Sequence, residues 1–203
     1  MEIVNPSHEI LDDIDGNAIL KKLELAGRTA YKSEELIDSV SAIKFIRNIV
    51  KRGHESVIEH INLSVRFICD RGVTHEIVRH RLVAYTQEST RYCNYNKKGV
   101  TYIKPFFFKE NSEQYQYWLR AMSQCETEYN MLILSGASPQ EARSVLPNSL
   151  KTEIVCTANL REWRHILKLR TSQAAHPQMR ELMIPLLNEL KERIPVIFDD
   201  IEI

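Results

Sequence analysis

The segment RHRLVAYTQESTRYCNY, residues 79–95, carries a high density of side chains that can bind a charged ligand. Three arginines, Arg79, Arg81 and Arg91, lie within thirteen residues of one another. An arginine pairs bidentately with phosphate, and hydroxyl and amide groups can complete the shell around it. Such groups are supplied here by Gln87, Ser89, Thr90 and Tyr92. The pattern favours a site for a small phosphorylated ligand, although a solvated loop held by ion pairs would use the same residue types.

Two later segments add basic residues to this candidate site. Arg143 lies in SPQEARSVLP, where a Ser-Pro start predicts a helix. Arg161 and His165 are four residues apart in NLREWRHILKLR, so on a helix they share one flank beside the apolar residues. A surface helix could carry this pair without any function. The presence of Arg170 at the end of the segment has no such simple structural explanation.

Metal and nucleophile patterns are weak in this chain. The segments HEIVRH (75–80) and HESVIEH (54–60) space their histidines five and six residues apart. On one helix these rings point about 140° and 240° away from each other, so neither pair can chelate zinc. Ser89 and Ser144 lack a GxSxG elbow, and Cys93 has no assignable base, which favours a packed thiol. We therefore predict neither a metal site nor a protein nucleophile.

Periodicity predicts the elements that must position these residues. Apolar residues at helical spacing predict helices over 16–31 and 38–52, and strict alternation predicts a strand over 61–70. A further helix is expected over 73–82 and a short strand after Gly99.

Cap residues and glycines bound the later elements. A long helix is expected from Ser112 to about Leu134, with Gly136 as its stop, and another from Ser138 to before Pro147. A strand over 151–158, a helix capped by Asn159 and a final helix over 177–193 complete the series. The sequence predicts one α+β domain over residues 1–203, with helices around a small, mainly antiparallel sheet.

Composition limits the function classes. Lys plus Arg and Asp plus Glu number 27 each, which argues against a general nucleic-acid binder because such proteins carry excess positive charge. The four cysteines form no CxxC pair, and no secretory signal or membrane-spanning apolar run is present. We expect a cytoplasmic protein with reduced thiols and no membrane partner.

The segment that opens with Arg79 resembles the RHRxxSxNExSxRY motif of the flavin-dependent thymidylate synthases. The matching positions are Arg79, His80, Arg81, Ser89, Arg91 and Tyr92. The chain departs from the motif at Ala84, Thr86 and Gln87, where the family has Ser, Asn and Glu.

Further blocks extend the resemblance in the family's order. GHESVIEH is similar to the family's GHExxxEH segment, EARSVLP to its AR-x-x-LP helix, and TANLREWRHILKLR to its arginine-containing segment near the C-terminus. AAHPQMRE fits the element that follows. The blocks run from about residue 53 to 182, so the resemblance covers most of the chain.

The resemblance implies an enzyme of known chemistry. The family transfers a methylene group from methylenetetrahydrofolate to dUMP and, with hydride from reduced FAD, forms dTMP; NADPH reduces the flavin again. It also implies a homotetramer with active sites between subunits. No protein nucleophile attacks the uracil in this family.

The resemblance also assigns site residues. Those implied to bind FAD are Ser56, Arg79, His80, Arg81, Gln87, Asn159, Leu160, Arg161 and His165. Those implied to bind dUMP are Glu76, Ile77, Val78, Arg79, Gln87, Glu88, Ser89, Thr90, Arg91, Arg143 and Arg170. Arg170 is the catalytic candidate, because a fixed cation at the uracil would favour loss of its N3 proton.

Two other classes remain open at this stage. A nucleotide- or RNA-binding module without catalysis could stack bases on Tyr85, Tyr92 and Tyr95. A flavoprotein of different reaction would use the flavin residues but leave Ser89, Arg143 and Arg170 without a role. Flavin absorbance tests the first class, and dUMP-dependent oxidation of reduced flavin tests the second.

Overall fold

The computed structural model describes residues 1–97 and 99–203 and divides them into two compact units. The first unit consists of Met1–Ser7, Arg66–Arg79 and Tyr85–Val155. The second unit consists of His8–Val65, His80–Ala84 and Cys156–Ile203. We describe each unit by itself.

The main sheet has the strand order β2-β3-β6-β4. Its strands are β2 (Ser7–Ile10), β3 (Asn62–Asp70), β4 (Ala84–Gln87) and β6 (Lys151–Asn159). Partners along β3 and β6 run in opposite directions: the Arg71 amide donates to the Leu150 carbonyl (3.2 Å), whereas the Thr157 hydroxyl donates to that of Ser64 (2.9 Å). This is an antiparallel pair, and the α+β class with a mainly antiparallel sheet is confirmed.

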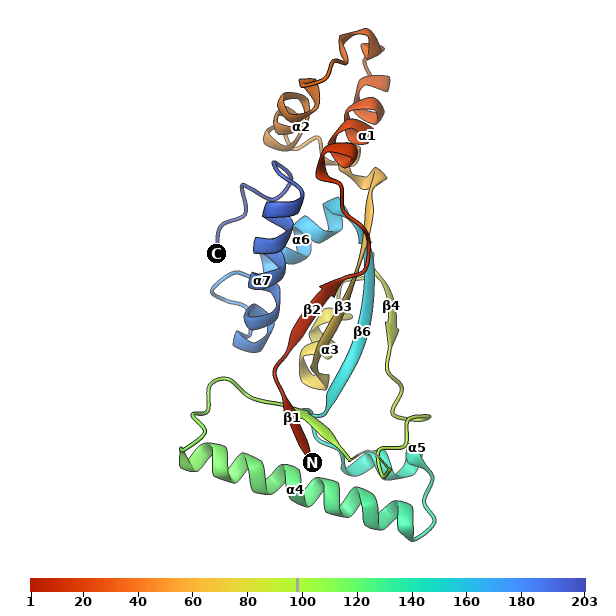
Figure 1. Cartoon of the computed structure of the whole chain (residues 1–203), viewed down its shortest axis with the longest axis vertical. Helices are drawn as coiled ribbons and strands as arrows, with labels where there is room; N and C mark the ends of the chain where they lie inside the picture. Colours follow the sequence, from red (N-terminus) through yellow and green to blue (C-terminus); the bar gives the residue numbers. More distant parts are fainter. Residues whose placement is uncertain (98) are drawn as a thin grey trace. The chain divides into compact units, whose positions relative to one another are not determined.

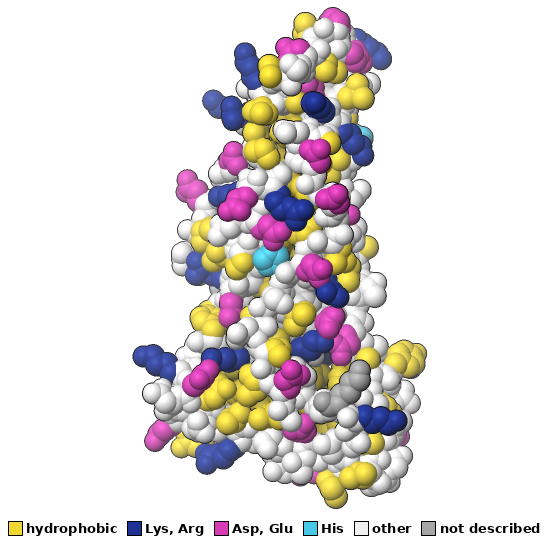
Figure 2. Space-filling view, in the orientation of Figure 1, with side chains coloured by type: hydrophobic (Ala, Val, Ile, Leu, Met, Phe, Trp, Pro, Cys, Tyr) yellow, Lys and Arg dark blue, Asp and Glu magenta, His cyan; other side chains and the backbone are white. Residues whose placement is uncertain are grey.

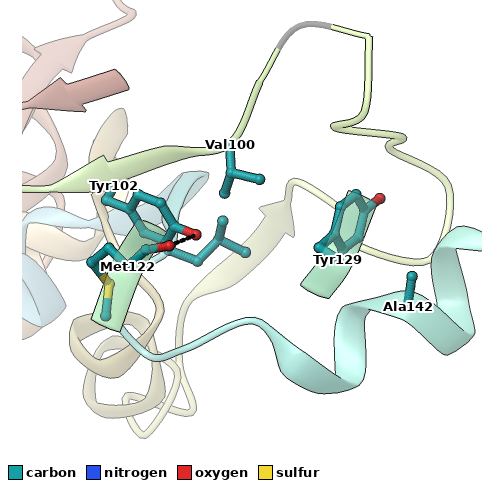
Figure 3. Packing of buried hydrophobic residues seen from close by; sticks show 6 residues of the cluster. Val100, Tyr102, Met122, Tyr129 and Ala142 are labelled. Atoms are coloured by element: carbon teal, nitrogen blue, oxygen red, sulfur yellow. Dashed lines mark hydrogen bonds between the residues drawn. The ribbon is translucent and has the colours of Figure 1, made fainter. Parts of the chain in front are cut away.

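The first unit is built around a long helix and a small parallel sheet (Figure 1). Its remaining elements are β1 (Glu2–Val4), α3 (Arg71–Ile77), β5 (Thr101–Ile103), α4 (Glu113–Leu134), α5 (Pro139–Ala142) and the 3-10 helix η3 (Arg143–Val145). β1 pairs with β5 in parallel register, Ile3 opposite Tyr102. In Figure 3 the rings of Tyr102 and Tyr129 point into one apolar cluster, and the Tyr102 hydroxyl donates to the Met122 carbonyl (3.1 Å). This cluster fixes α4 against β5.

The second unit is mostly helical (Figure 1). Its helices are α1 (Gly16–Thr29), η1 (Glu34–Leu36), α2 (Ser41–Lys51), η2 (Glu55–His60), α6 (Leu160–Arg170) and α7 (Pro177–Arg193). α6 packs against α7 and η2, and the Trp163 indole donates to the Leu63 carbonyl (3.0 Å). The buried Arg164 guanidinium pairs with Glu55 (3.0 Å) and Asp200 (2.6 Å). The face of α6 that carries Trp163 and Arg164 is therefore committed to the core.

Several predicted boundaries are confirmed by their caps. The Ser112 hydroxyl accepts from the amide of Tyr115 at the start of α4, and Gly136 follows the helix with φ +96°. Ser138 and Glu141 form the predicted capping box, and Asn159 accepts from the Glu162 amide at the start of α6. These signals were readable because a cap depends only on residues three apart.

One predicted helix is wrong at its end, and three strands were not predicted. The helix expected over 73–82 spans Arg71–Ile77 and is followed by turns and β4. The Tyr85 hydroxyl donates to the Ile77 carbonyl (2.7 Å), which satisfies an acceptor at the helix end. β1, β2 and β4 are only three or four residues long and show no strong apolar alternation. Their pairing comes from tertiary contacts that periodicity does not encode.

The surface shows no segregation of charge on the face in view. In Figure 2 basic and acidic side chains are interspersed there. Within the part of the chain that the structure describes, no helix is both long and apolar enough to cross a bilayer.

Candidate functional site

In the first unit, Gln87 ties the motif segment to two neighbouring elements. Its side-chain amide donates to the hydroxyl of Thr74 on α3 (3.1 Å) and to that of Thr152 on β6 (3.3 Å). The Thr74 hydroxyl in turn donates to the Arg71 carbonyl (2.8 Å). Gln87 is half-buried, so its amide nitrogen has a structural role and its carbonyl oxygen is the group that remains for a ligand.

The next residue, Glu88, belongs to a charged network. The Tyr95 hydroxyl donates to its carboxylate (2.8 Å), and Lys151 lies between Glu88 (3.2 Å) and Glu153 (2.6 Å). Burial, reinforced by the hydrogen bond to Glu88, raises the pKa of Tyr95, so the phenol stays protonated. Burial lowers the pKa of Lys151, but its contacts with Glu153 and Glu88 outweigh burial and raise that pKa overall. The Glu88 side chain is therefore held in place by Tyr95 and Lys151.

This network lines a pocket of about 820 Å³. Around it lie Glu2, Arg66, Thr86, Gln87, Glu88, Cys93, Asn94, Tyr95, Gly99, Thr101, Lys151, Glu153 and Val155. Both signs of charge are present, so the pocket suits a polar ligand without strong preference for anions.

A second pocket of the first unit, of about 430 Å³, joins two of the sequence blocks. It is lined by Arg71, Thr90, Gln140, Arg143, Ser144, Leu146 and Leu150. The Arg143 guanidinium donates to the hydroxyl of Thr90 (3.1 Å), which is buried. The contact brings together residues 53 positions apart. The predicted proximity of Arg143 to the motif is thus present in the structure.

The other first-unit residues of the predicted nucleotide set differ in accessibility. Ser89 is half-buried, and its hydroxyl accepts from the Arg91 amide (3.3 Å). Arg91 is exposed, with its guanidinium 5.5 Å from the centre of the Tyr92 ring.

At the end of α3, Glu76 is half-buried and Val78 and Arg79 are exposed. The buried Ile77 offers only backbone atoms, and its carbonyl already accepts from the Tyr85 hydroxyl.

In the second unit, His80 and Arg170 form a direct hydrogen bond. Arg170, the last residue of α6, donates from Nε to His80 Nε2 (3.0 Å). Burial, then the positive charge of Arg170 and then His165, lower the pKa of His80 from 6.5 to about 4. His80 is therefore neutral at pH 7, and the direction of the hydrogen bond places its proton on Nδ1.

The same imidazole belongs to a group that the sequence spacing did not reveal. His80, Glu162 and His165 hold three potential metal-ligand atoms within 4.8 Å of one another. His80 Nδ1 lies 3.8 Å from the Glu162 carboxylate, and the His80 and His165 ring centres are 5.9 Å apart. The guanidinium of Arg170 already occupies His80 Nε2, and its fixed positive charge disfavours a cation there. We assign no metal to this group.

Beside this group is a pocket of about 760 Å³. It is lined by Glu55, Glu59, Leu82, Asn159, Arg161, Glu162, Arg164, His165 and Lys168. Arg161 is exposed and pairs with Glu59 (2.6 Å), whereas Leu160 is fully buried and offers only its backbone. Three residues of the predicted flavin set, Asn159, Arg161 and His165, thus face one cavity.

The remaining flavin candidates are dispersed. Ser56, on η2, and Arg81 are exposed residues of the second unit. Arg79 and Gln87 belong to the first unit, whereas Arg170, predicted for the nucleotide, belongs to the second. Each predicted set therefore has members in both units.

The sequence did not single out Arg71, Lys151 or Glu162. Arg71 carried no usable signal, because the helix was expected to begin at residue 73 and in the structure begins at Arg71. The sequence also gave no sign that Lys151 and Glu162 belong to a site, because each approaches its partner only through tertiary contacts.

Comparison with known proteins identifies a matching family. Residues 14–196 match the family described as thymidylate synthase complementing protein. A flavin-dependent thymidylate synthase from Pyrococcus furiosus is 34% identical over 170 residues, covering 82% of this chain and 70% of that protein. One from Corynebacterium efficiens is 30% identical over 217 residues, covering 98% of this chain and 86% of that protein.

A solved structure agrees with the fold. The UMP/dUMP methylase PolB from Streptomyces cacaoi, bound with 5-Br dUMP, superposes with a TM-score of 0.80. The comparison covers 98% of this chain and 96% of PolB, at 23% identity.

Proposed function

We propose that this chain, which belongs to the family of thymidylate synthase complementing proteins, is a flavin-dependent thymidylate synthase that methylates dUMP to dTMP. The carrying observation is the hydrogen bond between His80 and Arg170. It joins the RHR motif to the last residue of the NLREWRHILKLR block, two segments that the family resemblance selects independently. If Arg170 were only a cation at the end of a helix, or the RHR motif only a surface loop, this hydrogen bond would not be needed.

The donor set of the second unit fits a flavin. Arg161, Lys168 and His165 line the 760 Å³ pocket beside Glu55, Glu59 and Glu162, so basic and imidazole groups lie at its wall for a phosphate-bearing cofactor, whereas Arg164 stays paired with Glu55 and Asp200. We assign FAD to Ser56, Arg79, His80, Arg81, Gln87, Asn159, Leu160, Arg161 and His165, with Leu160 contributing through its backbone. Bound FAD, once reduced, supplies the hydride for the reaction.

The nucleotide is assigned mainly to the first unit. dUMP would contact Glu76, Ile77, Val78, Arg79, Gln87, Glu88, Ser89, Thr90, Arg91, Arg143 and Arg170. Hydroxyl and amide groups of Ser89, Thr90 and Gln87 supply directional hydrogen bonds, and the arginines supply charge.

Arg170 acts on the uracil ring. Its guanidinium is held by neutral His80, and a positioned cation stabilises the negative charge that develops when the N3 proton is lost. The hydrogen bond from Nε to His80 gives the planar guanidinium a defined orientation.

Three of the four cysteines, Cys69, Cys125 and Cys156, do not suit a nucleophilic role. Burial raises the pKa of Cys156 to about 12, and burial also raises that of Cys125. Cys69 is buried as well. A thiol is a poor nucleophile when its pKa is raised, which agrees with chemistry carried by a cofactor.

The co-substrates and the setting complete the proposal. Methylenetetrahydrofolate would donate the carbon and NADPH would reduce the flavin. Residues 1–203 would act as one functional domain, in a homotetramer in the cytoplasm, without nucleic-acid or membrane partners.

The test is spectroscopic. The purified protein should show flavin absorbance, and its chemically reduced flavin should be reoxidised under anaerobic conditions only when dUMP and methylenetetrahydrofolate are both present, with formation of dTMP. A protein without flavin that binds RNA would support the alternative of a binding module. A flavoprotein whose oxidation ignores dUMP would support a different reaction.

A further inference from the structure

Arg71 has a backbone fixed by the structure and one buried guanidinium nitrogen without a hydrogen-bond partner. It is the first residue of α3, and its amide donates to the carbonyls of Asn148 (2.9 Å) and Leu150 (3.2 Å). Its guanidinium lines the 430 Å³ pocket of the first unit. The Nη1 atom is buried and has no hydrogen-bond partner among the described residues. A buried, charged donor without an acceptor is costly, and native proteins keep few of them.

The pocket that Arg71 lines has the chemistry of an anion site. Its polar groups are two guanidiniums, two hydroxyls and one amide, with no carboxylate among the lining residues. Arg143, the second guanidinium, donates to the hydroxyl of Thr90. The 820 Å³ pocket of the same unit differs in this respect, because three carboxylates line it beside its two cations. The smaller pocket therefore favours negative charge.

Helix α3 itself offers no reason for a cation at position 71. A positive charge at a helix N-terminus is opposed by the partial positive charge of the first backbone amides. Asp70 provides the cap of α3 by accepting from the Val73 amide (2.7 Å), so Arg71 is not needed for that. Its place in the pocket, with a buried nitrogen that lacks an acceptor, is instead what a ligand would explain.

We propose that Arg71 is a further nucleotide-binding residue, which binds the phosphate group of the substrate beside Arg143. The inference rests on the proposed function for the identity of the phosphate carrier. The two planar guanidinium forks can donate to different oxygens of one phosphate, and Thr90, Ser144 and Gln140 can complete its shell. A phosphate oxygen would thereby supply the acceptor that the buried Arg71 nitrogen lacks.

The experiment compares R71Q with the wild type as flavin-loaded holoenzymes. The dissociation constants of dUMP and of deoxyuridine, which lacks the phosphate, are measured by titration calorimetry. R71Q should weaken dUMP binding about 10- to 100-fold, the range for a lost hydrogen bond to a charged group, and change deoxyuridine binding less than about threefold. The KM for dUMP should rise more than kcat falls. Inorganic phosphate should compete with dUMP less well in R71Q than in the wild type.

R120Q is the matched control. Arg120 is exposed on α4 in the same unit, over the Tyr117 ring and outside the pocket, so its loss should leave dUMP affinity unchanged. R71K keeps the charge but not the fork and should fall between R71Q and the wild type. If R71Q does not fold, R71K serves in its place, and an unchanged dUMP affinity in the folded variant overturns the inference.

The remaining outcomes separate the two proposals. Equal losses for dUMP and deoxyuridine would mean that Arg71 supports the fold or the base, which also overturns the phosphate role. Wild-type protein that binds neither nucleotide would contradict the proposed function itself, whereas normal dUMP binding by R71Q would contradict only the assignment of Arg71.

Discussion

Arg170 Nε donates to His80 Nε2 across 3.0 Å, although the two residues are 90 positions apart in the chain. The hydrogen bond orients the guanidinium and fixes the tautomer of the imidazole at once. A residue that ends a helix is thereby given a defined direction, which a solvated C-terminal cation would lack.

Arg170→Lys should keep the fold and the flavin but lose most dUMP-dependent flavin oxidation, by about 10-fold or more, because an ammonium lacks the planar fork and cannot replace Nε at His80. Stability should fall by about 1 kcal/mol for the lost hydrogen bond. Stopped-flow oxidation and urea unfolding measure the two effects. Arg193→Lys, at the last position of α7, is the control. Near-wild-type turnover of a stable Arg170→Lys protein would remove Arg170 from the site.

The depressed pKa of His80 predicts a pH-dependent stability. An imidazole with a pKa of about 4 when folded and 6.5 when unfolded binds a proton more readily in the unfolded chain. The free energy of unfolding should therefore be highest above pH 6.5 and fall as the pH drops towards 4, by at most about 3 kcal/mol from this residue. Urea unfolding between pH 4.5 and 7.5 measures the slope. His80→Gln should flatten it; the same slope in both proteins would show that other groups cause it.

Ser89→Ala should weaken dUMP binding and leave measurable turnover. The side chain is expected to contribute one hydrogen bond to a charged group, worth roughly 1.5–3 kcal/mol. Affinity and single-turnover measurements on the holoenzyme distinguish binding from chemistry. A covalent adduct trapped on Ser89 would instead identify it as a nucleophile.

The protein should be a tetramer in solution. The resemblance places flavin and nucleotide groups in one motif, and a single copy cannot easily present both at one site. Light scattering of the flavin-loaded protein measures the mass directly. A monomer with full activity would contradict this expectation.

The elements that the sequence predicted well are those with local end signals. Helix α4 was bounded by Ser112 and Gly136, and α6 by Asn159 with Glu162, because caps depend on near neighbours. β4 was missed because its register is given by contacts such as the Glu88 amide donating to the Glu153 carbonyl (2.8 Å), far along the chain.

The candidate site likewise combines residues that the sequence indicated with residues that only the tertiary structure brings in. The resemblance grouped Arg143 with the motif, but their contact through Thr90 is a tertiary result. The buried Nη1 of Arg71 and the Glu162 carboxylate near His80 could not be foreseen, because burial and approach depend on how distant segments fold together.

The hydrogen bonds around Gln87 have a direction, and that direction restricts which residue can stand there. The Thr74 hydroxyl donates its single proton to the Arg71 carbonyl, so toward the side chain at position 87 it can act only as an acceptor. Glutamine has the N–H that this acceptor requires, whereas an ionised glutamate, the residue of the family motif, would bring two lone pairs together. The departure at position 87 is thus coupled to Thr74, and restoring the motif here would require Thr74 to turn its proton away from the backbone.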